Sequence, residues 1–206
     1  KGTTIGKEIV KKAKKEIKLL ENQKDSDKDY EYTRDNLYEL IRKGQEALDN
    51  ILEIGLSLTQ LVDAINRIAD TYKDALAPGF THLQHAQPIN FGHELAKHSH
   101  SFSRDISRIN DWVERNSYSP LGAGALAGSS LQPHPEKSAQ ALGFKGALGN
   151  SIDAVSDRDF AAEALFIFAM IGVHLSRIGE EFTLWSTTEF GWAKLDDAFS
   201  TGSSIM

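Results

Sequence analysis

The sequence predicts an all-α fold in which long helices pack side by side as a bundle. Apolar residues recur at alternating spacings of four and three over three long stretches, and no stretch alternates convincingly as a strand. All five prolines lie at or after Pro78. The four-three spacing places apolar side chains on one helix face, where they pack against other helices. Three helices would bury little of these faces alone, so we expect other subunits to complete the bundle.

The first long helix is predicted between Leu37 and Tyr72. Its apolar positions are Leu37, Ile41, Gly44, Leu48, Ile51, Gly55, Leu58, Val62, Ile65, Ala69 and Tyr72. Each glycine costs a helix about 1 kcal/mol relative to alanine. We therefore expect a neighbouring helix to approach closely at both. The polar stretch 21–32 is interpreted as a linker or turn, so we divide the chain into an N-terminal helical segment with its linker, 1–32, and a helical-bundle domain, 33–206.

Two further long helices follow the same spacing. One carries Phe91, Leu95, His98, Phe102, Ile106, Ile109 and Val113, and the other carries Phe160, Ala164, Ile167, Ile171, Leu175, Ile178, Phe182 and Trp185. The third helix is predicted to start with Ser156 as its N-cap, followed by Asp157 and Asp159, because acidic side chains favour a helix N-terminus. Between these two helices the glycine-rich stretch LGAGALAGSS predicts a loop, with a short helix near 136–142.

Composition excludes several classes of protein. There is no cysteine, which rules out disulfides and thiolate metal sites, and the net charge of −6 disfavours a nucleic-acid binder. The longest apolar run, Ala164 to Val173, has 10 residues, about half of a membrane span, and is interpreted as a buried helix. The N-terminus lacks an apolar leader. We expect a cytoplasmic protein that contacts neither membranes nor nucleic acid.

The histidines do not form a recognisable metal site. A zinc site needs three or four ligands that converge on one point. His93, His98 and His100 do not share one helical face, and no acidic cluster completes a set. We therefore expect scattered surface histidines and no bound metal.

His82 is set apart by its position in a proline-bounded break, APGFTHLQHAQP, between two predicted helices. A histidine titrates near working pH and can give or take a proton. Thr81 and Gln84 lie beside it. Position alone leaves two roles open, a catalytic group and a hydrogen-bonded structural histidine.

Two other polar stretches are candidates for a site. STGSSIM, at 200–206, is a small-residue loop whose backbone N–H groups could hold a carboxylate, although an ordinary loop has the same composition. In NSIDAVSDRDF, at 150–160, helix capping does not explain Asp153 or Arg158. Each of these two could face a polar pocket or the surface.

Taken together, these stretches resemble the argininosuccinate lyase family of the fumarase/aspartase superfamily. PGFTHLQHAQP, PLGAGALAGSS, NSIDAVSDRDFAAE, HLSRIGEE, WSTTEFGW and STGSSIM occur in the family's order over residues 75–206. The resemblance is weak over 1–74. It implies a homotetramer built on a central bundle of long helices, with active sites shared between subunits. It also implies reversible cleavage of argininosuccinate to arginine and fumarate, without a cofactor.

The resemblance also implies the site residues. His82 and Ser203 correspond to the acid–base pair, while Thr81 and Asn36 correspond to groups that contact substrate. Ser204 corresponds to a residue whose backbone N–H holds a carboxylate. We favour Ser203 as the base that takes the carbon-bound proton and His82 as the group acting on the leaving nitrogen, with the reverse assignment left open. Because the signature continues beyond GSSIM, we expect the chain to be part of a longer enzyme and to be inactive alone.

Three alternatives remain at the level of sequence. Another fumarate-releasing lyase of the superfamily, such as an adenylosuccinate lyase, would share the chemistry but not the leaving group; SDRDF argues against it. A non-catalytic, crystallin-like scaffold would share the fold alone. A plain helical interaction module would leave the THLQ and GSS stretches unexplained.

Overall fold

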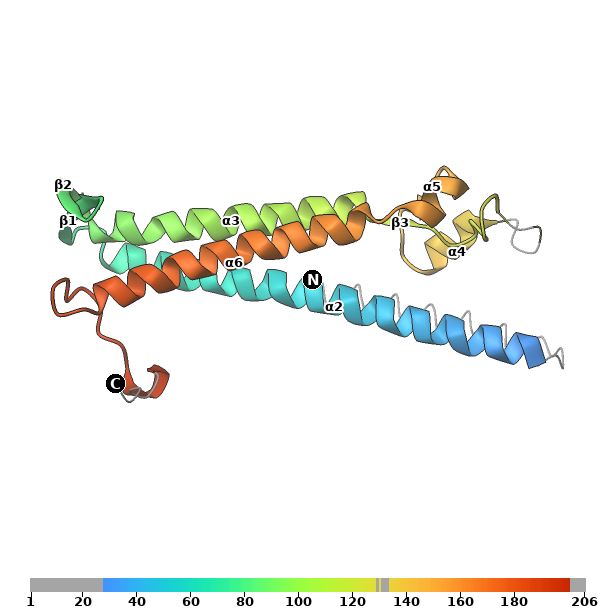
Figure 1. The fold of residues 1–206 in the computed structure, drawn as a ribbon, viewed down its shortest axis with the longest axis horizontal. Coiled ribbons are helices and arrows are strands. Elements are labelled where there is room, and N and C mark those ends of the chain that lie inside the picture. Colours follow the sequence, from blue (N-terminus) through green and yellow to red (C-terminus); the bar gives the residue numbers. More distant parts are fainter. Residues whose placement is uncertain (1–27, 129, 131–133, 201–206) are drawn as a thin grey trace. The chain divides into compact units, whose positions relative to one another are not determined.

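The structure is a computed structural model that describes residues 28–128, 130 and 134–200, with side chains from Asn50 onward. Within that part the long helices are α2 (Lys28–Thr71), α3 (Phe91–Arg115) and α6 (Asp159–Trp185), as Figure 1 shows. This confirms the helical fold class and the three long helices. The chain divides into two compact units, of which unit 1 is Lys1–Gln60 with Ile106–Ala164 and unit 2 is Leu61–Asp105 with Leu165–Met206.

Unit 2 packs the first part of α3 against the second part of α6 in antiparallel fashion (Figure 1). Near the start of α3, the ring of Phe91 lies 5.3 Å from the ring of Trp185 at the end of α6. Further along, Asp105 of α3 contacts His174 of α6. The end of α2 joins at Gly92, where an added Cβ would lie only 2.2 Å from the Ala69 carbonyl oxygen. Only glycine permits so close an approach.

A β-hairpin connects α2 to α3 and corrects the expectation that the chain has no strands. β1 (Leu76–Thr81) pairs antiparallel with β2 (Gln84–Asn90), and the register shifts between Pro78 and Phe80. The strands escaped prediction because almost every residue of β2 is exposed, so no apolar–polar alternation develops. Prolines face each other across the pair, Pro78 opposite Pro88, which also weakens the usual strand signal.

Unit 1 contains four further short elements, whereas the 3-10 helix η1 (Asp197–Phe199) belongs to unit 2. β3 (Tyr118–Ser119) pairs parallel with β4 (Gly146–Ala147), and α4 (Pro135–Ala141) and α5 (Ser151–Ser156) flank the second of these strands in sequence. The predicted short helix near 136–142 is therefore confirmed as α4. The glycine-rich stretch is a loop, as predicted, and left-handed backbone at Gly122, Gly124 and Gly128 explains its glycines.

The predicted start of α6 was wrong. Ser156 is the last residue of α5 rather than an N-cap, and its hydroxyl donates back to the Ile152 carbonyl oxygen. The Asp157 side chain instead accepts a hydrogen bond from the Asp159 backbone N–H, 2.8 Å away, where α6 begins. The short helix α5 and the start of α6 both carry acidic residues suited to a first turn, so the spacing of these residues does not reveal the break between the two helices.

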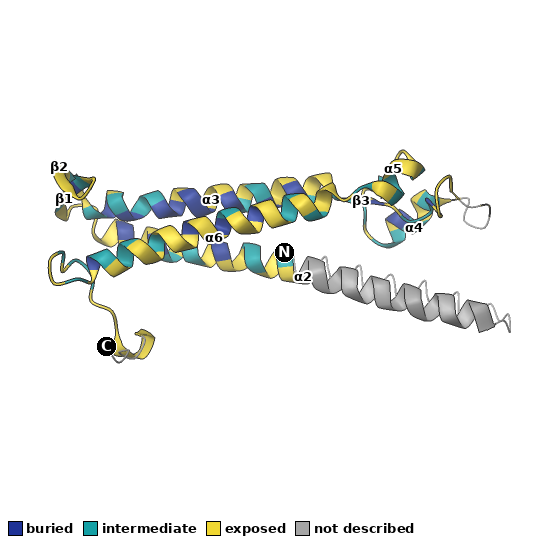
Figure 2. Cartoon of the chain, viewed as in Figure 1, coloured by how far each residue is buried: buried dark blue, intermediate teal, exposed yellow. Residues whose placement is uncertain are grey.

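Of the 22 described seam positions, nine are half-buried, three are exposed and ten are buried as predicted (Figure 2). The buried positions are Leu58, Ile65, Ala69, Leu95, His98, Phe102, Ile109, Ile167, Ile171 and Trp185. On α6 one buried position lies one residue earlier than predicted, since His174 is buried whereas Leu175 is 47% exposed. The expected close approach at Gly55 is absent within the described part, since an added Cβ there would meet nothing within 4 Å. The other glycine of that prediction, Gly44, lies outside the described side chains.

The rest of α6 exposes apolar side chains. A row with three- and four-residue spacing runs along it, consisting of Leu165, Phe168, Gly172, Leu175 and Gly179, all exposed. We call this row the outer seam. Among the described helices, α6 is the one long and apolar enough to cross a membrane by length and composition, criteria that the core helix of a soluble protein also meets. The prediction that the apolar run from Ala164 to Val173 is buried was wrong for the single chain, in which only Ile167 and Ile171 of this run are buried.

Candidate functional site

His82 lies at the tip of the hairpin, in a two-residue turn with Leu83. Both residues have left-handed backbone, with φ of 53° and 59°. Such a pair matches the right-handed twist of the strands, but hairpins normally place Asn-Gly there. A left-handed conformation in other residues costs about 1–3 kcal/mol each and persists where the surroundings impose it. The tip is therefore a strained position occupied by a titratable side chain.

The two residues next to the turn bring further polar groups to the tip. Thr81 pairs with Gln84 across the strands, and both are exposed, as is His82. The tip thus presents an imidazole, a hydroxyl and a carboxamide to the outside of unit 2. Together these groups can donate hydrogen bonds to a carboxylate, and the imidazole can give or take a proton.

The hairpin is anchored at its base by backbone contacts. The Phe91 N–H donates to the Ala75 carbonyl oxygen at 2.8 Å, and the Gly92 N–H donates to the Tyr72 carbonyl oxygen at 3.1 Å. Within the hairpin, an added Cβ on Gly79 would lie 2.7 Å from the Gln87 carbonyl oxygen, so the bulged strand also depends on a glycine. The base of the hairpin is therefore held at the junction of α2 and α3, and its strands pack closely on each other.

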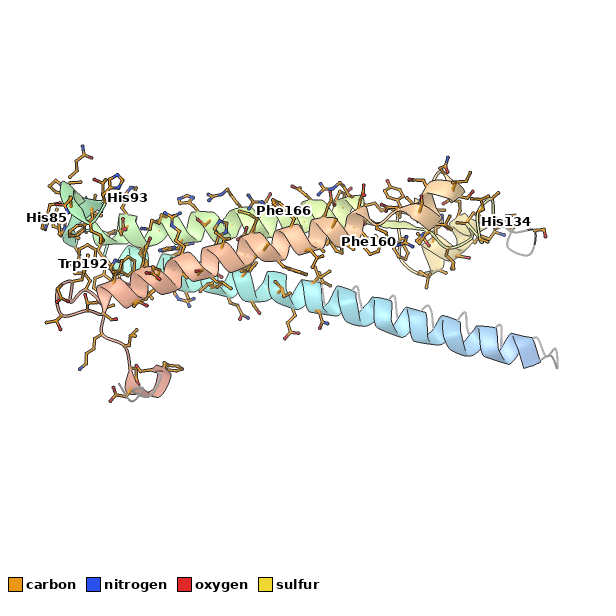
Figure 3. The ribbon with its side chains drawn as sticks, in the orientation of Figure 1. His85, His93, His134, Phe160, Phe166 and Trp192 are labelled. Carbon is orange, nitrogen blue, oxygen red and sulfur yellow. The ribbon has the colours of Figure 1, made fainter. Side chains whose placement is uncertain are left out.

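Aromatic side chains pack beneath the same hairpin. The ring of Phe80 lies 4.9 Å from His85, 5.1 Å from Phe190 and 6.0 Å from Trp192, measured between centroids. Trp192 in turn contacts the ring of Phe91 at 5.8 Å. Figure 3 shows His85 and Trp192 at this end of unit 2. The segment that follows α6 thereby supports the strand that leads to His82.

The other predicted site residues are not brought to the hairpin by the described part of the chain. Ser203 and Ser204 lie outside the described residues. Asn36 falls within α2, at a position whose side chain is also outside them. Asp153 and Arg158, which could have faced a pocket, are exposed, and the Arg158 guanidinium donates to the Val155 carbonyl oxygen. The site roles of all these residues, those of Thr81 and His82 included, stay predictions.

One histidine was misjudged as a surface residue. His93 and His100 are exposed, but His98 is 2% exposed, and its Nε2 atom lies 2.7 Å from Oε2 of Glu181. Burial lowers the pKa of His98 from its ordinary value of 6.5, although the hydrogen bond and the charge of Glu181 raise it. The Lys97 ammonium lies 2.8 Å from the same Glu181 oxygen and opposes protonation of His98. The place of His98 on the apolar seam was the signal for its burial.

Sequence reasoning missed a second buried pair in unit 2. Nδ1 of His174 lies 2.6 Å from Oδ2 of Asp105, whose side chain is fully buried. The ring of Phe102 packs edge-on against His174. Neither member follows the apolar spacing, so no pattern within either helix indicated that they would meet. Over the described residues, no group of three histidine, aspartate or glutamate side chains is arranged to hold a metal ion.

The profile of the family described as Lyase matches residues 45–206. The chain belongs to this lyase family. It is 61% identical over 158 residues to the argininosuccinate lyase of Frankia casuarinae, covering 77% of this chain and 34% of that protein. It is 56% identical over 156 residues to the argininosuccinate lyase of Acidothermus cellulolyticus, covering 74% and 32%. The chain therefore spans about a third of the length of these curated relatives.

Solved lyase structures have the same fold. The crystal structure of EDDS lyase in complex with formate superposes with a TM-score of 0.72 at 34% identity, covering 77% of this lyase chain and 32% of that one. The resemblance to argininosuccinate lyases of the fumarase/aspartase superfamily is thereby confirmed, and the match reaches back to residue 45, beyond the stretch that carried it.

Proposed function

We propose that this chain is the central part of an argininosuccinate lyase, which reversibly cleaves argininosuccinate to arginine and fumarate. The identity of 61% to the enzyme of that name from Frankia casuarinae carries the proposal. The position of Thr81 and His82 at an exposed, strained hairpin tip supports it, because a catalytic imidazole must reach substrate.

The reaction is a β-elimination that needs a base, an acid and donors for a carboxylate. In our assignment the Ser203 oxygen removes the proton from the carbon next to a carboxylate, and His82 protonates the guanidinium nitrogen that departs. Electrons of the broken C–H bond form the double bond of fumarate as the C–N bond breaks. Thr81, Asn36 and the Ser204 backbone N–H hold the substrate, and donors that meet the developing negative charge supply most of the stabilisation.

We further propose that the enzyme is a homotetramer whose active sites combine residues of different subunits. The outer seam of α6 supports this, because a row at heptad spacing with exposed leucines and a phenylalanine is suited to packing against other long helices. Assembly in water, rather than insertion into a membrane, would then cover the apolar length of α6.

The assay of this proposal uses the longest available form of the protein and argininosuccinate, with fumarate followed by ultraviolet absorbance. We expect the parent to release fumarate and both His82→Asn and Ser203→Ala to be slower by about two to four orders of magnitude, the usual effect of losing an acid–base group. His100→Asn, which changes an exposed histidine of α3, serves as the matched control and should retain activity.

Absence of fumarate release from a folded tetramer would overturn the assignment. Adenylosuccinate would then be the next substrate to test. Inactivity toward both would favour a non-catalytic, crystallin-like scaffold with the same fold.

A further inference from the structure

We propose that Trp192, together with Phe190, is a positioning residue that holds the His82 hairpin in its working orientation. This inference rests on the proposed function of His82 and extends it to a segment outside the proposed site residues. The segment, EFGW at 189–192, follows α6 and begins 99 residues after Asn90, the last residue of the hairpin.

Phe80 provides the contact between the two segments. It lies in β1 two residues before His82, and its ring packs against the rings of both Phe190 and Trp192, at 5.1 and 6.0 Å. Tilted and edge-on aromatic pairs at such distances are favourable beyond the area they bury, and they prefer particular ring orientations. A shift of the hairpin relative to α6 would therefore disturb both pairs at once.

The support itself is held in place on the end of α6. The Trp192 and Ala193 N–H groups both donate to the Trp185 carbonyl oxygen, at 2.9 and 3.0 Å. Gly191, with a φ of 60°, allows the chain to reverse there, and its N–H donates to the Thr187 carbonyl oxygen. The indole of Trp192 also packs against Phe91 at the start of α3. Trp192 thus contacts α6, α3 and the hairpin.

The strained turn explains why such support is needed. His82 and Leu83 both hold left-handed backbone that neither residue type favours, so the turn keeps its shape only while its strands are held. The exposed β2 strand contributes little burial of its own. Packing on Phe80 is the described contact that joins the strand next to the tip to the end of α6.

The test compares Trp192→Ala, Trp192→Phe and the milder Phe190→Leu in the longest available form of the protein. Misplacement of a catalytic group by about 1 Å can cost about a hundredfold in rate. We expect Trp192→Ala to lower kcat at least about tenfold while KM changes much less. Trp192→Phe should recover most of the rate, and Phe190→Leu should show a smaller loss.

Hydrogen–deuterium exchange gives a readout that does not depend on activity. In Trp192→Ala we expect faster exchange in peptides covering 76–90, with no change in peptides covering 95–105 of α3. Phe102→Leu is the matched control, because it shortens a fully buried aromatic side chain of unit 2 whose described ring contact is with His174. It should leave kcat and hairpin exchange at the parent values.

The outcomes separate this inference from the proposed function. If the parent releases no fumarate from argininosuccinate, the proposed function fails, and exchange in the hairpin still decides whether Trp192 supports it. Parent-like kcat and exchange in Trp192→Ala would overturn the inference. So would a loss of rate that Trp192→Phe does not recover, or one that Phe102→Leu reproduces.

Discussion

Nδ1 of His174 lies 2.6 Å from Oδ2 of Asp105, and this contact joins α6 to α3 inside unit 2. The carboxyl group is fully buried and the imidazole nearly so, which makes this a buried polar contact between the two helices. Breaking a buried pair leaves one member without its compensating charge, whereas replacing both members with apolar groups removes the desolvation cost as well.

The pair predicts a non-additive response to substitution. We expect Asp105→Leu to lower the free energy of unfolding by about 3–5 kcal/mol, because His174 loses its buried partner. Asp105→Leu combined with His174→Leu should recover most of that loss. Urea unfolding followed by circular dichroism, at one fixed protein concentration, measures both. Equal losses in the single and double variants would contradict this account of the pair.

A pH-dependent stability is predicted for His98. Its pKa is lowered in the folded protein, mainly by burial, so the unfolded chain binds a proton at this site more readily than the folded one. Stability is therefore lost as pH falls below the ordinary pKa of 6.5, down to the lowered value. His98→Gln keeps a donor for Glu181 but cannot titrate. Thermal unfolding midpoints between pH 7.5 and pH 5 should fall less in this variant than in the parent. An unchanged slope would show that other groups account for the acid sensitivity.

Gly92 is predicted to tolerate no side chain. An alanine Cβ there would lie 2.2 Å from the Ala69 carbonyl oxygen and 2.8 Å from the Lys73 Cα atom, both parts of the backbone. We expect Gly92→Ala to cost at least about 1–3 kcal/mol, as overpacking does. Gly149→Ala is the matched control, because a Cβ there meets nothing within 4 Å, and it should stay within about 0.5 kcal/mol of the parent. Similar unfolding curves for the two variants would contradict the close packing of α2 on α3.

Assembly is predicted to depend on the outer seam of α6. We expect Leu165→Glu and Leu175→Glu to convert the proposed tetramer into smaller species, because each would introduce a charge into an interface that excludes water. Glu180→Lys, which changes an exposed charge on the same helix outside the seam, should leave assembly intact. Light scattering coupled to size-exclusion chromatography, without detergent, gives the mass of each variant. A parent that is monomeric under these conditions would refute the tetramer.

Sequence periodicity predicted the long helices well because their burial repeats with the helical period. Leu95, Phe102 and Ile171 are buried at the positions where the four-three spacing places them. The hairpin lacked such a signal, because β2 is exposed on both faces and its prolines are atypical of strands. The Asp105–His174 pair joins two residues that are 69 positions apart and lie on different helices. Spacing within one helix does not encode how two helices align.

The candidate site was found in sequence by different means. Thr81 and His82 stood out through their surroundings and through resemblance to a family, and the structure adds the left-handed turn that presents them. The aromatic support of Trp192 could not be inferred, because its contact with Phe80 spans most of the chain and follows no repeating pattern.

Because the turn has only two residues, insertions and deletions at the hairpin tip are restricted. With Thr81 paired to Gln84, one added or removed residue at the tip would shift β2 by one position and exchange its faces. Phe80 would then face a different set of partners, and the imidazole would project from another point in space. Changes of chain length, which surface loops ordinarily tolerate, are therefore excluded at this exposed tip. The position of the His82 imidazole can therefore be changed by substitution but not by a change in chain length.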